Sequence, residues 1–123
     1  IQDSTVIHLA SDRGTRVGDY VTVGHKALLH ACEVDDEVLI GLGSIVMYVA
    51  RIGARSIVAA GTVVTRDMEV PPGSLVVGTP GKVVKSLDTN EQQSIRGWAE
   101  KYIKVSGEHR EFLDLQNCEP IAE

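Results

Sequence analysis

The sequence predicts a mainly β fold, a parallel β-helix of six-residue repeats followed by a C-terminal α-helix. Valine or isoleucine recurs at every sixth residue without a break, at Val34, Ile40, Val46, Ile52, Val58, Val64, Val70 and Val76. Period six fits neither a helix nor simple strand alternation. It suits a short strand and a tight corner, and three such sides make a triangular coil of about 18 residues with strands about 4.7–4.9 Å apart. An ordinary β-sandwich with a chance period is the alternative.

Two irregularities interrupt the first repeats. A four-residue insertion lies in the turn-rich loop Leu9–Arg16, and a deletion of one residue lies at the corner that holds Cys32. Insertions break a solenoid locally and often mark a functional face. We predict a β-helix domain over residues 1–87. Because the chain starts at Ile1 in the middle of the pattern, we expect N-terminal coils of this domain to be missing.

A different pattern follows the repeats. The segment 78–81 is rich in glycine and proline and predicts a turn. Helical spacing then predicts a C-terminal helix over 88–115, with Thr89 and Gln92 as a capping box and 116–123 as a tail. Its apolar stripe must cover either its own β-helix or a neighbouring subunit, and consists of Ile95, Trp98, Ala99, Tyr102 and Ile103.

Composition narrows the classes of partner. The net charge is −5 and no basic run is present, which argues against nucleic acid and anionic membranes as partners. No apolar segment is long enough for membrane insertion. Two cysteines are too few for a secreted disulfide scaffold and favour a reducing compartment, which we expect to be the cytoplasm, or the mitochondrial matrix in a eukaryote.

Three of the four histidines lie within the first thirty residues. His8 and His30 each follow an inward residue, and they are separated by one coil plus the insertion, so they should stack on one edge of adjacent coils. His25 belongs to another side of the triangle, so a second chain would have to supply it. Three imidazoles with an open fourth position are typical of catalytic zinc, although iron and cobalt also suit such ligands. Three unrelated surface histidines remain the alternative.

Segments 1–8, 23–32, 40–44 and 77–84 resemble gamma-class carbonic anhydrase. The resemblance implies a left-handed β-helix and a homotrimer whose metal is shared between adjacent subunits, with His8, His25 and His30 as ligands. It implies that Gln2 hydrogen-bonds near the metal-bound solvent, that Asp3 joins an interface ion-pair network and that Tyr102 approaches the site.

The sequence also departs from the family. The loop Leu9–Arg16 is short and offers only Asp12 in place of a longer acidic loop with a proton-shuttling glutamate. Tyr48 and Val49 stand where relatives commonly have an Asp-Gly turn. We expect slow turnover, limited by proton release.

The resemblance implies reversible hydration of carbon dioxide to bicarbonate by metal-bound hydroxide at the trimer interfaces. Gln2 would orient the hydroxide and Tyr102 would assist catalysis. Two alternatives stay open, a non-catalytic structural subunit of a larger assembly and an acyl-CoA thioesterase or acyltransferase of the wider hexapeptide-repeat group.

Overall fold

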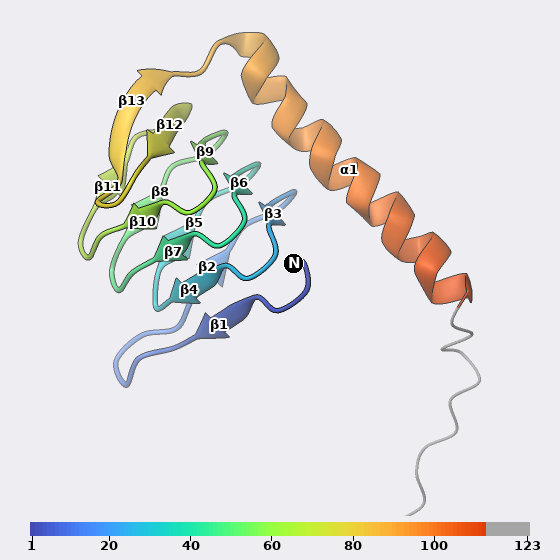
Figure 1. Cartoon of the computed structure of the whole chain (residues 1–123), viewed down its shortest axis with the longest axis horizontal. Coiled ribbons are helices and arrows are strands. Elements are labelled where there is room, and N and C mark those ends of the chain that lie inside the picture. The colour runs from blue at the N-terminus through green and yellow to red at the C-terminus, as the bar shows by residue number, and fades with distance from the viewer. Residues whose placement is uncertain (113–123) are drawn as a thin grey trace, which may run out of the picture.

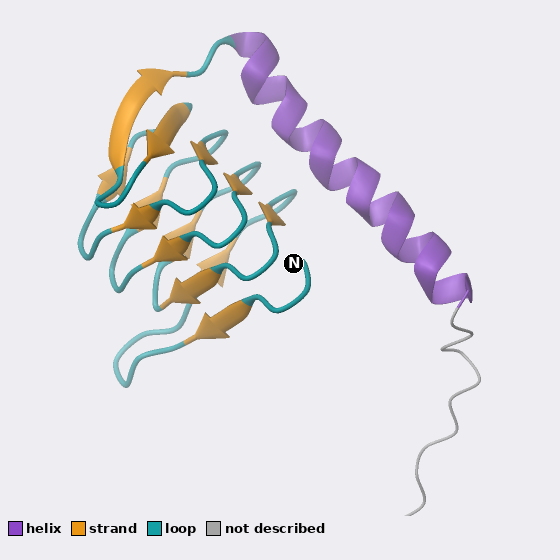
Figure 2. Ribbon diagram, viewed as in Figure 1, coloured by secondary structure: helices purple, strands orange, loops and turns teal. Residues whose placement is uncertain are grey.

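A computed structural model describes residues 1–112 and shows a triangular parallel β-helix with one long helix beside it (Figure 1). Each coil contributes one short strand to each of three sheets, which confirms the predicted fold class (Figure 2). The first sheet contains β1 (Val6–His8), β4 (Leu28–His30), β7 (Ile45–Val46) and β10 (Val63–Val64). The second contains β2 (Arg16–Val17), β5 (Glu33–Val34), β8 (Arg51–Ile52) and β11 (Glu69–Val70).

The third sheet ends the solenoid. It contains β3 (Thr22–Val23), β6 (Leu39–Ile40), β9 (Ile57–Val58), β12 (Ser74–Val77) and β13 (Lys82–Ser86). The sequence did not predict β13, which folds back after the turn at 78–81 and pairs antiparallel with β12. Its side chains do not continue the six-residue repeat. Its antiparallel direction ends the stack of parallel coils.

The column of inward valines and isoleucines is the core. All eight predicted inward residues from Val34 to Val76 are buried, with exposed fractions of 0% to 3%. Both register irregularities also lie where they were predicted: Ile7 pairs with Leu29, and Val17 pairs with Val34. Ile7 itself is 46% exposed because only one neighbouring coil packs against it.

The helix α1 (Thr89–Phe112) runs along the β-helix and contacts β3 (Figure 1). Ile95 and Ala99 are buried, whereas Trp98 and Tyr102 remain 44% and 39% exposed, so the chain covers only part of the apolar stripe. No helix within the described residues is long and apolar enough to cross a membrane.

The predicted capping box was wrong by one residue. Asp88 accepts a hydrogen bond from the backbone N–H of Glu91, and Glu91 accepts one from the backbone N–H of Asp88. Aspartate is a better N-cap than threonine, so the helix begins one residue earlier than the Thr89–Gln92 pair implied. Gln92 instead donates to the carbonyl of Leu87.

Each corner of the triangle contains a residue in the left-handed region. At the corner between the first and second sheets these residues are Ala31, Val49 and Asp67. Val49 has a φ of 65°, which is an unusual conformation for a β-branched residue. The corner geometry therefore imposes strain at this position.

We predict that Val49→Asn stabilises the fold by about 1 kcal/mol, because a left-handed conformation costs most L-residues about 1–2 kcal/mol and asparagine tolerates it. Urea unfolding measures the change in free energy. Lys26→Asn, at an unbranched left-handed position (φ 58°), is the control and should give a smaller gain. An equal gain in both variants would contradict strain at Val49.

Candidate metal centre

His8 and His30 lie at the ends of β1 and β4 and pair directly in the parallel register. Their rings are stacked, with centroids 5.3 Å apart and planes within 8° of parallel. The two Nδ1 atoms are 3.3 Å apart. The structure therefore brings together the two histidines that the spacing placed on one edge.

This spacing fits a shared metal ion. A tetrahedral ion with metal–nitrogen bonds of about 2.0–2.1 Å keeps two ligand nitrogens about 3.3 Å apart. The same 3.3 Å contact also has hydrogen-bonding geometry, with one Nδ1–H donating to the other Nδ1 according to the tautomers of the two rings. A divalent ion bound by both Nδ1 atoms would take the place of this hydrogen bond.

His25 does not join this pair within the chain. It follows β3 at a different corner, where its Nδ1 lies 3.9 Å from the carboxylate of Asp3. Within residues 1–112, no three histidine, cysteine, aspartate or glutamate side chains converge on one potential metal position. A three-histidine centre would therefore need His25 from another copy of the chain.

Gln2 and Asp3 lie with His25 rather than with the histidine pair. The backbone N–H of Gln2 donates to the carbonyl of Val23, and the carbonyl of Asp3 accepts from the N–H of Lys26. Tyr102, on α1, stacks on Trp98 with ring centroids 6.3 Å apart. Because α1 contacts β3 on the third sheet and the histidine pair lies on the first sheet, a role of Tyr102 at the pair would require a neighbouring copy.

Cys32 is not available as a ligand. Its side chain is fully buried in the core, and this burial raises the pKa of the thiol to about 11. Metals bind the thiolate, and at neutral pH this thiol stays protonated.

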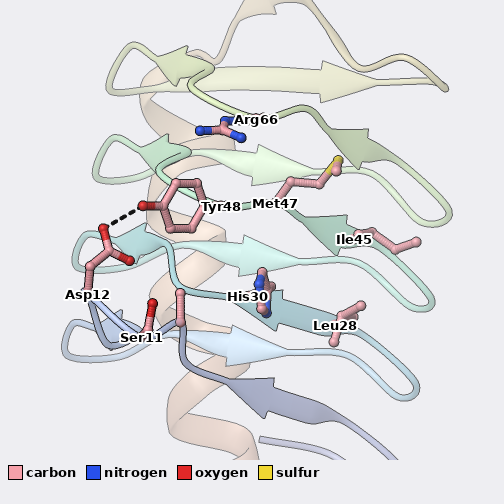
Figure 3. A pocket seen from close by; sticks show the side chains of 9 residues that line it. Ser11, Asp12, Leu28, His30, Ile45, Met47, Tyr48 and Arg66 are labelled. Carbon is pink, nitrogen blue, oxygen red and sulfur yellow. Dashed lines mark hydrogen bonds between the residues drawn. The ribbon is translucent and has the colours of Figure 1, made fainter.

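An open groove of about 600 Å³ adjoins His30 (Figure 3). One wall comes from the inserted loop, through Ala10, Ser11 and Asp12, and the rest comes from the outer side of the first sheet and the corner above it. Tyr48 donates a 2.6 Å hydrogen bond to Asp12, and this bond lowers the pKa of the Asp12 carboxyl.

The sequence did not predict that Met47, Tyr48 and Arg66 lie near the histidines. The position of Met47 could have been predicted from the sequence. Counting the register through the one-residue deletion places Met47 next to His30, in the outward column that begins with His8. The direction of the Tyr48 side chain depends on the corner conformation, which the repeat does not encode.

The outer faces of the sheets differ sharply in chemistry. The second sheet carries an in-register ladder of alternating charge formed by Arg16, Glu33, Arg51 and Glu69. The first sheet, which carries the histidine pair, has an apolar column formed by Val6, Leu28, Ile45 and Val63. Val6 is 53% exposed and the other three are partly exposed.

Comparisons with known proteins identify relatives, although no family model matches the chain. The chain is 42% identical over 106 residues to "Probable carbonic anhydrase" of Methanocaldococcus jannaschii, covering 86% of this chain and 67% of that protein. It is 33% identical over 115 residues to "Gamma carbonic anhydrase 2, mitochondrial" of Arabidopsis thaliana, covering 89% of this chain. The chain spans only 41% of the length of this plant relative.

A solved structure has the same fold. The hexapeptide transferase family protein from Anaplasma phagocytophilum matches with a TM-score of 0.81 and 39% identity. The match covers 86% of this chain and 62% of that chain.

We predict that Zn²⁺ or Co²⁺ raises the melting temperature of the protein and that His30→Ala removes this effect. Binding at a hundredfold excess over the dissociation constant stabilises a folded protein by about 2.7 kcal/mol. Differential scanning calorimetry with and without metal measures the shift. His109→Ala, on the exposed end of α1, is the matched control and should behave as wild type. An undiminished shift in His30→Ala would contradict a metal site at the stacked pair.

Proposed function

The chain belongs to the gamma-class carbonic anhydrase family, and we propose on this basis that it reversibly hydrates carbon dioxide to bicarbonate at a metal ion held between neighbouring copies of the chain. The observation that carries this proposal is the 3.3 Å separation of the Nδ1 atoms of His8 and His30, with His25 displaced to another corner. One copy of the chain would supply His8 and His30 from one edge. His25, at another corner, would bind the ion held by a second copy.

The apolar column on the first sheet supports an assembly. Exposed aliphatic side chains beside a polar centre are typical of a subunit interface. The charge ladder on the second sheet has the opposite character and suits solvent. A homotrimer, in which each interface combines His8 and His30 of one copy with His25 of the next, would use the apolar face and complete three equivalent sites.

Three neutral imidazoles and an open fourth position fit zinc, and also iron or cobalt. A divalent ion bound there would supply a nucleophile at neutral pH, because it lowers the pKa of water to about 7. The chain's own residues would hold the ion and shape its surroundings. Since Gln2 lies on the coil next to His25, it would reach the centre from the same copy as His25 and orient the attacking oxygen.

Proton removal would depend on the buffer. Asp12 is the only carboxylate of the inserted loop, and its hydrogen bond from Tyr48 lowers the pKa of its carboxyl. A general base works best when its pKa lies near the operating pH, so Asp12 is a poor proton acceptor at neutral pH. We therefore propose that turnover is limited by proton transfer to buffer.

The direct test is stopped-flow hydration of carbon dioxide by the metal-loaded protein, with the chelated protein as control. We expect metal-dependent turnover that rises with buffer concentration. His8→Ala, His25→Ala and His30→Ala should each lower kcat/KM by at least about 100-fold, because the acceleration depends on the bound ion. His109→Ala is the matched control. Turnover that survives chelation and all three substitutions would contradict the proposal.

Mixing variants tests the shared centre. His25→Ala subunits keep His8 and His30, and His30→Ala subunits keep His25, so neither forms an intact site alone. After denaturation and joint refolding at equal concentrations, about a quarter of the interfaces in random trimers combine the intact halves. Activity should recover to about a quarter of wild type. No recovery from folded, mixed trimers would place all the ligands within one chain.

The alternatives predict other outcomes. Metal binding without turnover would favour a non-catalytic subunit of a larger assembly. Cleavage or transfer of an acyl-CoA without any metal requirement would favour the activity suggested by the name of the structural relative in the hexapeptide transferase family.

A further inference from the structure

The inserted loop is held at its base and at its tip. At the base, the Thr15 hydroxyl donates to the backbone carbonyl of His8 at 2.7 Å. Within the loop, the N–H of Ala10 donates to the carbonyl of Arg13 at 2.9 Å. At the tip, Asp12 accepts the 2.6 Å hydrogen bond from Tyr48 (Figure 3). The base contact connects the loop directly to the backbone of a proposed ligand.

Tyr48 reaches Asp12 across 36 residues of sequence. It follows β7 on the third coil, whereas the loop follows β1 on the first coil, so the contact spans the edge where His30 lies between them. Arg66 lies over the Tyr48 ring, with its guanidinium carbon 4.9 Å from the ring centroid. Arg13, from the loop itself, approaches the same ring at 6.0 Å.

The backbone next to Tyr48 is strained. Val49 has a positive φ of 65°, and the residues at the same corner of the neighbouring coils, Ala31 and Asp67, share this left-handed conformation, so it is a property of the corner. This conformation turns the chain directly after Tyr48. The unusual Tyr48-Val49 corner therefore has a structural use, because it carries the side chain that holds the loop.

We propose that Tyr48 and Asp12 form a latch that fixes the inserted loop against the groove beside His30, and that Tyr48 is thereby a positioning residue for the metal centre. The positioning part rests on the proposed function. The latch itself does not, because it depends only on contacts within the chain. Through Thr15, a loose loop would disturb the backbone of His8 and so the orientation of its ring. Loss of contacts that orient a ligand directly typically changes metal affinity about 10–100-fold, and we expect an effect at the lower end for this indirect contact.

The hydrogen bond also gives the latch a pH range. It lowers the pKa of the Asp12 carboxyl and raises the pKa of the Tyr48 hydroxyl. The contact is therefore complete above the unfolded pKa of aspartate, about 3.9, and is lost as pH falls through the lowered folded value. At the alkaline end it is complete below about pH 10 and is lost as pH rises through the raised value of Tyr48.

Limited trypsin digestion tests the latch without metal or turnover. Cleavage after Arg13 should be about 10-fold faster in both Tyr48→Phe and Asp12→Asn, since local opening exposes the bond. The double variant should be cut no faster than either single variant, because both remove the same contact. Tyr20→Phe is the matched control, since its ring lies under Arg96 and its hydroxyl makes no hydrogen bond within the described residues.

Amide hydrogen exchange of residues 10–14 provides a second measurement, and the melting temperature shows that each variant is folded. Unchanged cleavage and exchange in either single variant, or additive effects in the double variant, would overturn the latch. Co²⁺ titration followed by visible absorption then tests positioning. The dissociation constant should rise about 10-fold in Tyr48→Phe and stay unchanged in Tyr20→Phe.

The two parts can fail separately. If cleavage accelerates but Co²⁺ affinity stays at the wild-type value, the positioning role is overturned and the latch stands. If the wild-type protein binds no Co²⁺ at all, the proposed function fails, the positioning role fails with it, and digestion still decides the latch.

Discussion

The register of stacked coils is the constraint on which every other feature depends. Each rung is fixed by parallel backbone hydrogen bonds, and from Val34 to Val76 also by an inward valine or isoleucine in a narrow, buried column. A slip of one residue in a strand would turn its inward side chains outward, so the pairing register of each strand is strongly specified. His8 and His30 face each other only because a full coil and the inserted loop separate them. The candidate centre is thus a property of the register more than of any local motif.

The sequence predicted what the repeat encodes. The inward residues, both register irregularities and the pairing of His8 with His30 follow from counting, and the structure confirms each of them. Features outside the repeat were harder to predict. The strand β13 has no six-residue period. The helix α1 is capped by Asp88, which is adjacent to the predicted cap Thr89. Tyr48 meets Asp12 only because a strained corner and a loop conformation coincide, and neither leaves a periodic signal.

The outer surfaces of the three sheets differ in the side chains that they expose. The second sheet carries paired charges and needs no cover. The third sheet is partly covered by α1, which is fixed by Arg96 lying over the ring of Tyr20 and pairing with Glu37 at 3.4 Å. The first sheet combines exposed aliphatic side chains with the stacked histidines. This asymmetry shows how a nearly uniform repeat can give one side of the molecule a surface chemistry that the other two sides lack.

Changes in the inserted loop and changes in the rungs on either side of it have different consequences. Its ends are fixed by the rungs that pair His8 with His30 and Arg16 with Glu33, so its length can vary without moving either rung. Doubling the length of a flexible loop costs only about 0.6 kcal/mol in closure entropy. The surroundings of the histidine pair can therefore be exchanged by evolution or by grafting, provided that the contact of Thr15 with the carbonyl of His8 is kept. In this architecture the proposed ligands His8 and His30 lie on the stacked coils, and part of their surroundings lies on a loop that can be exchanged.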